Sequence, residues 1–162
     1  MGGFSVVVLM GILSFIYLFF IAIFVAVVLY IIMSYTFQGI SIMCMCKNMG
    51  YKNTFTAWIP FYNKYLLGKI AGNKIMGAIS GILSFIAICL GTRFYINKEL
   101  EIVLFIILVI SLIITFILDT MIAHRIYKSR ANKYGDILTV FNILSLGLLR
   151  PIFLFIVRNK KE

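Results

Sequence analysis

The feature that most constrains this chain is an uninterrupted apolar stretch near its beginning. Residues 4–33 contain nothing more polar than Ser and Tyr, and the first charged residue is Lys47. A helix over residues 4–33 would be about 45 Å long, whereas the hydrocarbon core of a bilayer is about 30 Å thick. The sequence therefore predicts a first membrane-spanning helix over residues 4–33 that is tilted or protrudes from the bilayer.

The rest of the chain is also too apolar for a water-soluble surface. Of its 162 residues, 63% are hydrophobic and 12% are charged, against about 45–50% and about 25% in soluble domains. Three later apolar segments predict further spans over residues 75–91, 100–120 and 137–157. We therefore expect one domain, residues 1–162, that is all-α: an integral membrane helical bundle of about four transmembrane helices plus a short interfacial helix.

A narrow polar stripe follows the first predicted span. Ser34, Gln38, Ser41 and Asn48 recur at helical spacing, with Met45 as the one break. Such a stripe fits a helix that emerges into the membrane interface or one that packs against a neighbour. We favour emergence.

The segment 47–74 combines aromatic and basic residues and contains no acid. Trp and Tyr gather at membrane boundaries because their rings are apolar and their polar atoms need water. Pro60 disfavours a helix at the preceding residue, so the chain is expected to turn there and start a short helix, residues 64–71, that Asn63 caps. We expect this helix to lie on the headgroups of the cytoplasmic face, with Leu66, Ile70 and Tyr65 turned toward the membrane. The residues assigned to lipid headgroups are Trp58, Tyr62, Lys64, Tyr65, Lys69 and Lys74. An ordinary connecting loop, a partner-docking site and a substrate site remain open for the same segment.

The distribution of basic residues predicts the orientation in the membrane. Segment 47–74 holds five Lys, and segment 121–136 holds four Lys or Arg; segment 93–101 holds two, matched by two Glu. The positive-inside rule assigns the two basic segments to the cytoplasm and the N-terminus to the outside. Four complete spans would then leave the basic ending "RNKKE" outside. The alternative is a final segment that bends at Arg150-Pro151 and re-enters from one side.

Two stretches resemble a known family. "WIPFYNKYLLGKIAG" and, much later, "ANKYGDILTVFNILSLGLLRPIFLFIV" are similar to small bacterial multi-span membrane proteins that share a domain of unknown function. The resemblance covers about residues 47–157, and it departs from the family pattern at Arg150 and at the closing "RNKKE". It implies the fold and a bacterial cytoplasmic membrane, but no activity. The matching residues are Trp58, Pro60, Tyr62, Asn63, Lys69, Gly72, Lys133, Gly135, Pro151 and Phe153.

Two ionisable residues fall inside predicted spans and are the candidate intramembrane polar residues. Asp119 lies at the end of the third span and Arg150 lies two-thirds of the way along the fourth. Charged groups at such depth are costly and are functional candidates for that reason. Their estimated depths differ, so a direct pair is not expected. The structural alternatives are a boundary carboxylate balanced by Arg125 and an arginine that snorkels to the surface.

The sequence contains no constellation typical of catalysis or metal binding. His124 is the single histidine, and Cys44, Cys46 and Cys89 lack the spacing of a zinc site or a disulfide framework. We therefore expect no catalytic residues, no metal, no cofactor and no enzymatic activity. Gly77 and Gly81 form a GxxxG pattern, which we assign to helix packing, within the monomer rather than between copies.

These observations favour one function and leave a second. A non-enzymatic accessory or interaction protein needs only spans, packing motifs and a basic cytoplasmic face. The alternative is a small oligomeric transporter or channel subunit that uses Asp119 and Arg150. The net charge of +10 is spread over loops, which indicates anionic lipid headgroups rather than nucleic acid. A membrane-protein partner or a second copy of the chain completes the expected partners.

Overall fold

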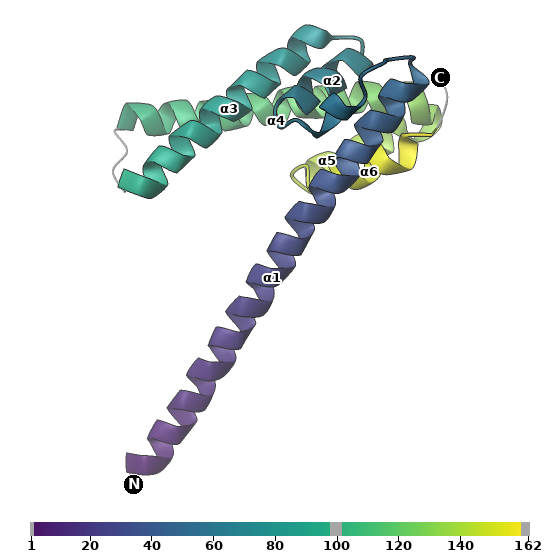
Figure 1. Ribbon diagram of the computed structural model, residues 1–162. Coiled ribbons are helices and arrows are strands. Elements are labelled where there is room, and N and C mark those ends of the chain that lie inside the picture. The colour runs from purple at the N-terminus through teal and green to yellow at the C-terminus, as the bar shows by residue number, and fades with distance from the viewer. Residues whose placement is uncertain (1, 98–101, 160–162) are drawn as a thin grey trace. The chain divides into compact units, whose positions relative to one another are not determined.

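The structure is a computed structural model that describes residues 2–97 and 102–159, and it is all-α over these residues. Figure 1 shows the order of the helices. They are α1 (Gly2–Asn48), the short 3-10 helix η1 (Phe55–Trp58), α2 (Tyr62–Ile70), α3 (Lys74–Asn97), α4 (Ile102–Ala131), the 3-10 helix η2 (Asn132–Tyr134), α5 (Gly135–Leu144) and α6 (Arg150–Val157).

Three helical stretches of the described chain are long and apolar enough to cross a membrane. They are Val7–Asn48, Lys74–Ile96 and Ile102–Leu144. The last includes α4, whose 30 residues extend about 45 Å and exceed the thickness of the hydrocarbon core. The predicted all-α fold with membrane-spanning helices is confirmed to this extent, and the three stretches indicate a multi-pass membrane protein.

The chain divides into two compact units, Met1–Thr36 and Phe37–Glu162. In the first unit every side chain from residue 7 to residue 33 is exposed. A helix that is apolar on all sides fits a lipid environment on all sides, as the first predicted span requires.

The second unit contains the hydrophobic core, and the last turns of α1 take part in it. Ile42 and Met45 of α1 are fully buried together with Tyr127 of α4 and Leu154 of α6. Ser41 is fully buried as well. The expectation that this end of α1 emerges into the membrane interface is therefore wrong. The polar stripe lies on a helix that packs against its neighbours.

The short helix α2 packs closely against α3. A Cβ at Gly77 would lie 2.6 Å from the carbonyl oxygen of Lys64 and 2.8 Å from the Cα of Gly68, and one at Gly81 would lie 2.9 Å from the carbonyl oxygen of Phe61. The two helices are thus antiparallel and nearly touch along the glycine pattern. Leu66 and Ile70, which were expected to face the membrane, are each 6% exposed and part of the core. The prediction that Leu66 and Ile70 face the membrane is therefore wrong.

The turns around α2 differ in detail from the sequence prediction. Ile59 is extended (φ −81°, ψ 120°), as expected before a proline, and Phe61 adopts φ 65°, a region that non-glycine residues rarely occupy. The helix then begins at Tyr62, with Asn63 buried inside it rather than capping it. Asn73 supplies a cap to the next helix, since its Oδ1 accepts a hydrogen bond from the N–H of Met76 (3.2 Å).

The predicted fourth span, residues 137–157, is not one helix. Helices α5 and α6 contain 10 and 8 residues, or about 15 Å and 12 Å, so neither crosses the hydrocarbon core. The chain reverses between them at Leu146 (φ 52°) and Gly147 (φ 83°), where the N–H of Gly147 donates to the carbonyl of Asn142 (2.8 Å). The prediction that this segment crosses the membrane once as a single helix is therefore wrong. The chain does bend back, as the alternative proposed, but it does so at Leu146 and Gly147, before Arg150-Pro151.

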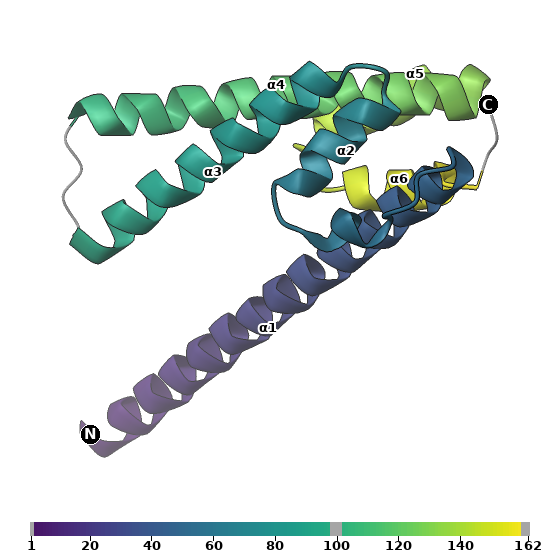
Figure 2. The same ribbon diagram turned by 45° about the horizontal axis from the view of Figure 1, so that its top comes forward.

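The direction of each short helix follows from its contacts with α4. Gly135 lies against Lys128, and Gly147 lies against Phe116, so α5 runs antiparallel to α4. Helix α6 then runs parallel to α4 and ends near its last turn, where Nη1 of Arg130 donates to the carbonyl of Arg158 (3.2 Å). Figure 2 shows α6 beside the end of α1, and Nδ2 of Asn48 donates to the same carbonyl (3.4 Å). The last turns of α1, α4 and α6 thus meet at one end of the second unit.

We expect Gly77→Ala to destabilise the protein and Gly91→Ala, on the same helix, to leave it unchanged or more stable. A Cβ at position 77 would lie within 3 Å of backbone atoms of α2, whereas one at position 91 meets nothing within 4 Å. Overpacking of this kind costs about 1–3 kcal/mol. Thermal unfolding of both variants in detergent micelles is the measurement. Equal melting temperatures would contradict the close approach of α2 and α3.

Candidate functional site

The candidate site is built around a buried carboxylate on α4. Asp119 lies about 25 Å along this helix from Ile102, and its side chain is 9% exposed. An isolated ionised carboxylate is very costly in such surroundings. Its position therefore requires partners that supply positive charge and hydrogen bonds.

Three side chains meet this requirement. Arg150 Nη1 lies 2.7 Å from Oδ2 of Asp119, and Lys64 Nζ lies 2.9 Å from the same oxygen. The other oxygen, Oδ1, accepts a hydrogen bond from the hydroxyl of Ser80 on α3. Charge-assisted bonds of this kind are about twice as strong as neutral ones. We call Lys64, Ser80, Asp119 and Arg150 the ion cluster.

The two cations reach Asp119 because each follows a reversal of the chain. Lys64 lies in the first turn of α2, just after the turn at Pro60 and Phe61. Arg150 is the first residue of α6, just after the reversal between α5 and α6. The start of a helix carries partial positive charge, so each short helix also favours a carboxylate near its first turn.

Ser84 completes the surroundings of Lys64. Nζ of Lys64 donates to Oγ of Ser84 (2.6 Å), and Ser84 donates in turn to the carbonyl of Ser80 (2.7 Å). Burial lowers the pKa of Lys64 below its ordinary value; the Asp119 carboxylate opposes this shift, and the charge of Arg150 adds to it. The lysine is therefore held among groups that stabilise its charge only in part.

The ion cluster carries an excess of positive charge. It contains two cations and one carboxylate, and the side chains of Lys64 and Arg150 are 17% and 20% exposed. Two nearby polar atoms, Nε of Arg150 and Oγ1 of Thr115, are buried and have no hydrogen-bond partner among the described residues. Such unpaired buried groups are uncommon in native proteins and call for an explanation.

One sequence expectation about this site is wrong, and the structure gives a second residue a role that the sequence did not suggest. Asp119 and Arg150 were expected at different depths, but the reversal before α6 brings Arg150 back to the level of Asp119. Lys64 was assigned to lipid headgroups, but it binds Asp119. A carboxylate inside a membrane-spanning segment indicates that cationic side chains lie near it. The sequence did not show which lysine this would be, because segment 47–74 reads as interfacial.

The other residues singled out from the sequence lie outside the ion cluster. The ring of Trp58 lies against Gly39 of α1, and Nζ of Lys69 lies 4.0 Å from the ring centroid of Tyr51. Lys74 is exposed, and the rings of Tyr62 and Tyr65 lie 5.4 Å apart. Contact of these residues with headgroups stays a prediction.

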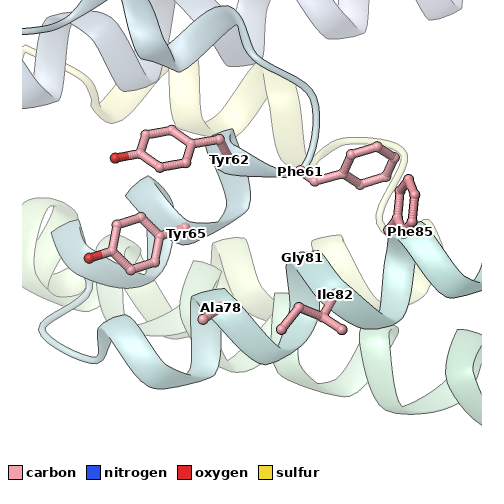
Figure 3. Close-up of a pocket in the computed structure, with 7 residues that line it drawn as sticks. All are labelled: Phe61, Tyr62, Tyr65, Ala78, Gly81, Ile82 and Phe85. Atoms are coloured by element: carbon pink, nitrogen blue, oxygen red, sulfur yellow. The ribbon is translucent and has the colours of Figure 1, made fainter.

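Aromatic side chains line a hollow of about 460 Å³ between α2 and α3 (Figure 3). Phe61 and Phe85 meet edge to face, with ring centroids 5.3 Å apart. The hydroxyls of Tyr62 and Tyr65 point away from this hollow. The lining is apolar, so the hollow suits hydrocarbon and offers no chemistry.

A larger cavity, of about 700 Å³, lies between α3 and α4. Lys64, Ser84 and Thr115 are its polar lining residues near the ion cluster, and Leu108 and Leu112 are among its apolar residues. It therefore connects the positively charged ion cluster with an apolar space.

Metal ligands do not gather in the part of the chain that the structure describes: residues 2–97 and 102–159 contain no group of three or more His, Cys, Asp or Glu. His124 instead faces α5, with Nδ1 2.9 Å from Oγ1 of Thr139 and 3.9 Å from a carboxylate oxygen of Asp136. The three cysteines are free thiols.

Comparison of the chain with protein-family models, curated proteins and solved structures gave no match.

We expect Asp119→Asn to lower the free energy of unfolding by about 3 kcal/mol, because it leaves two buried cations without a counter-charge. Asn is nearly isosteric and can still accept the hydrogen bond from Ser80. Equilibrium unfolding in mixed detergent micelles is the measurement.

Asp136→Asn is the matched control for this variant. It removes the same charge from a side chain that is 75% exposed, and surface changes of this kind are usually within about 0.5 kcal/mol. The double variant Asp119→Asn, Lys64→Gln should recover part of the loss, since one unpaired cation is removed with the carboxylate. Equal stability of Asp119→Asn and Asp136→Asn would contradict a structural role of the ion cluster.

Proposed function

We propose that the protein is a non-enzymatic accessory or interaction protein of a bacterial cytoplasmic membrane. The observation that carries this proposal is the meeting of three helix ends at one basic end of the molecule. The carbonyl of Arg158 accepts hydrogen bonds from Asn48 and from Arg130. Lys47, Lys128 and Lys133 are exposed around this end, where they are suited to anionic headgroups or an acidic partner.

The orientation in the proposal puts this basic end in the cytoplasm and the N-terminus outside. Three crossings with this orientation leave segments 47–74 and 121–136 on the cytoplasmic side. Because α6 ends beside α4, Arg158 lies at the same end of the molecule. Three crossings agree with the positive-inside rule, whereas four crossings would place the basic ending outside.

The ion cluster supports a structural role more than a catalytic one. Both oxygens of Asp119 are engaged, one by Ser80 and the other by Lys64 and Arg150. A general base needs a free lone pair directed at its substrate, whereas both oxygens of Asp119 already face donors of the protein. Asp119 is therefore a poor candidate for general base catalysis or for proton coupling.

A small transporter or channel subunit is the second candidate. It is favoured by the contact of Asp119 with Arg150 inside a stretch able to span the membrane. Transport would require these contacts to open during each cycle. We rank it second because Asp119 is bound to Ser80, Lys64 and Arg150 in the structure.

The orientation is tested by single cysteines introduced at Ser5, Asn97, Asn132 and Lys161 of a chain without its own cysteines. We expect an impermeant thiol reagent to label positions 5 and 97 in intact cells, and positions 132 and 161 only after the membrane is opened. Labelling of position 161 from outside would restore the fourth crossing, and labelling of position 132 would overturn the orientation.

The interaction role is tested by a photo-crosslinking amino acid at Lys133, with Arg93 as the control position. Both side chains are exposed, but they lie on opposite ends of the α3–α4 pair. We expect a reproducible protein adduct from position 133 that Lys128→Glu weakens, and none from position 93. Equal adducts from both positions, or adducts insensitive to Lys128→Glu, would contradict a partner site at the basic end.

A further inference from the structure

The cavity between α3 and α4 has a polar inner end and walls that are mostly apolar, with Thr92 and Tyr95 as the polar exceptions at its outer end. Lys64 and Thr115 contribute to it near the ion cluster, whereas Ala87, Ile88 and Leu112 line it as apolar residues. Along α3 it extends from Ser84 to Tyr95, which is about 16 Å by helix rise. Helices α3 and α4 diverge in the direction away from α2 in both views (Figures 1 and 2).

The polar end has hydrogen-bonding capacity that the described contacts do not use. A lysine ammonium carries three donors, and Lys64 directs them to Ser84 and Asp119 in two described bonds. Thr115 is 9% exposed, and its hydroxyl has no partner among the described residues. Because the ion cluster has two cations and one carboxylate, this end of the cavity lacks one negative charge.

We propose that the cavity binds a long-chain carboxylate, with its carboxylate at Lys64 and Thr115 and its hydrocarbon chain between α3 and α4. One negative charge neutralises the excess of the ion cluster. The volume of about 700 Å³ lies in the usual range for small-molecule sites, which are apolar with a few polar groups.

The charge requirement is tested with two probes, radiolabelled oleate and oleyl alcohol, and the full chain in phosphatidylcholine nanodiscs. We expect oleate to bind at least about tenfold more tightly, because a hydrogen bond to a charged group contributes more than one to a neutral group. Equal affinity would mean that bilayer lipid merely fills the space, and it would overturn the proposal without any variant.

The location is tested by Gly91→Phe, with Gly11→Phe as the matched control. A Cβ at either glycine meets nothing within 4 Å, but only Gly91 lines the cavity. We expect Gly91→Phe to weaken oleate binding at least about tenfold and Gly11→Phe to leave it unchanged. Unchanged binding in Gly91→Phe would overturn the site.

Thr115→Val then tests the position of the carboxylate. This variant removes the unpaired hydroxyl and lies outside the ion cluster. It should weaken oleate binding about fivefold and leave oleyl alcohol binding unchanged. Equal loss for both probes would place the carboxylate elsewhere and overturn the proposed orientation. These results are independent of the labelling and crosslinking experiments, which concern the basic end of the molecule.

Discussion

The contact of one carboxylate with two cations is the interaction on which the second unit of the molecule depends. Helices as short as α2 and α6, with 9 and 8 residues, have little stability by themselves and form because of tertiary contacts. Asp119 supplies such a contact to both, since Lys64 and Arg150 bind the same oxygen. A buried ion pair often contributes little net stability, but the loss of one partner is costly. The main effect of the ion cluster is therefore on specificity. It disfavours folds in which the turn before α2 or the reversal before α6 moves away from Asp119.

Close backbone contact makes this interaction geometrically possible. Gly68 and Gly77 let α2 approach α3 until their backbones nearly touch, which brings Lys64 within reach of Ser84 and Asp119. The reversal at Leu146 and Gly147 does the same for Arg150. In each case a local feature of the backbone brings a charged side chain to Asp119. Non-helical backbone within a membrane protein is tolerated where it is buried in protein.

Much of the helical fold was predictable from hydropathy, because span length follows directly from bilayer thickness. The apolar runs before Lys47 and within α3 and α4 needed no tertiary information. The fourth segment was misread as one span, since its Gly147 is a single residue in an apolar run and its left-handed conformation appears only in the structure. Asp119 and Arg150 were recognised as important, but their contact depends on that reversal. Lys64 was missed because burial in protein and burial in lipid headgroups leave the same aromatic and basic pattern in a sequence.

The distribution of space around the ion cluster separates binding from transport. On the side of Lys64 lies the cavity of about 700 Å³, whereas on the side of Arg150 the space among Leu67, Asp119 and Leu154 has a volume of about 10 Å³. That smaller space holds at most one water molecule. A ligand that enters beside Lys64 therefore meets a closed wall, and the donors available to it are those that Asp119 does not use. Binding needs no opening of the ion cluster, whereas passage through it would require breaking the contacts that hold α2 and α6. The same interaction that stabilises the fold thus favours binding of the proposed ligand over its passage across the membrane.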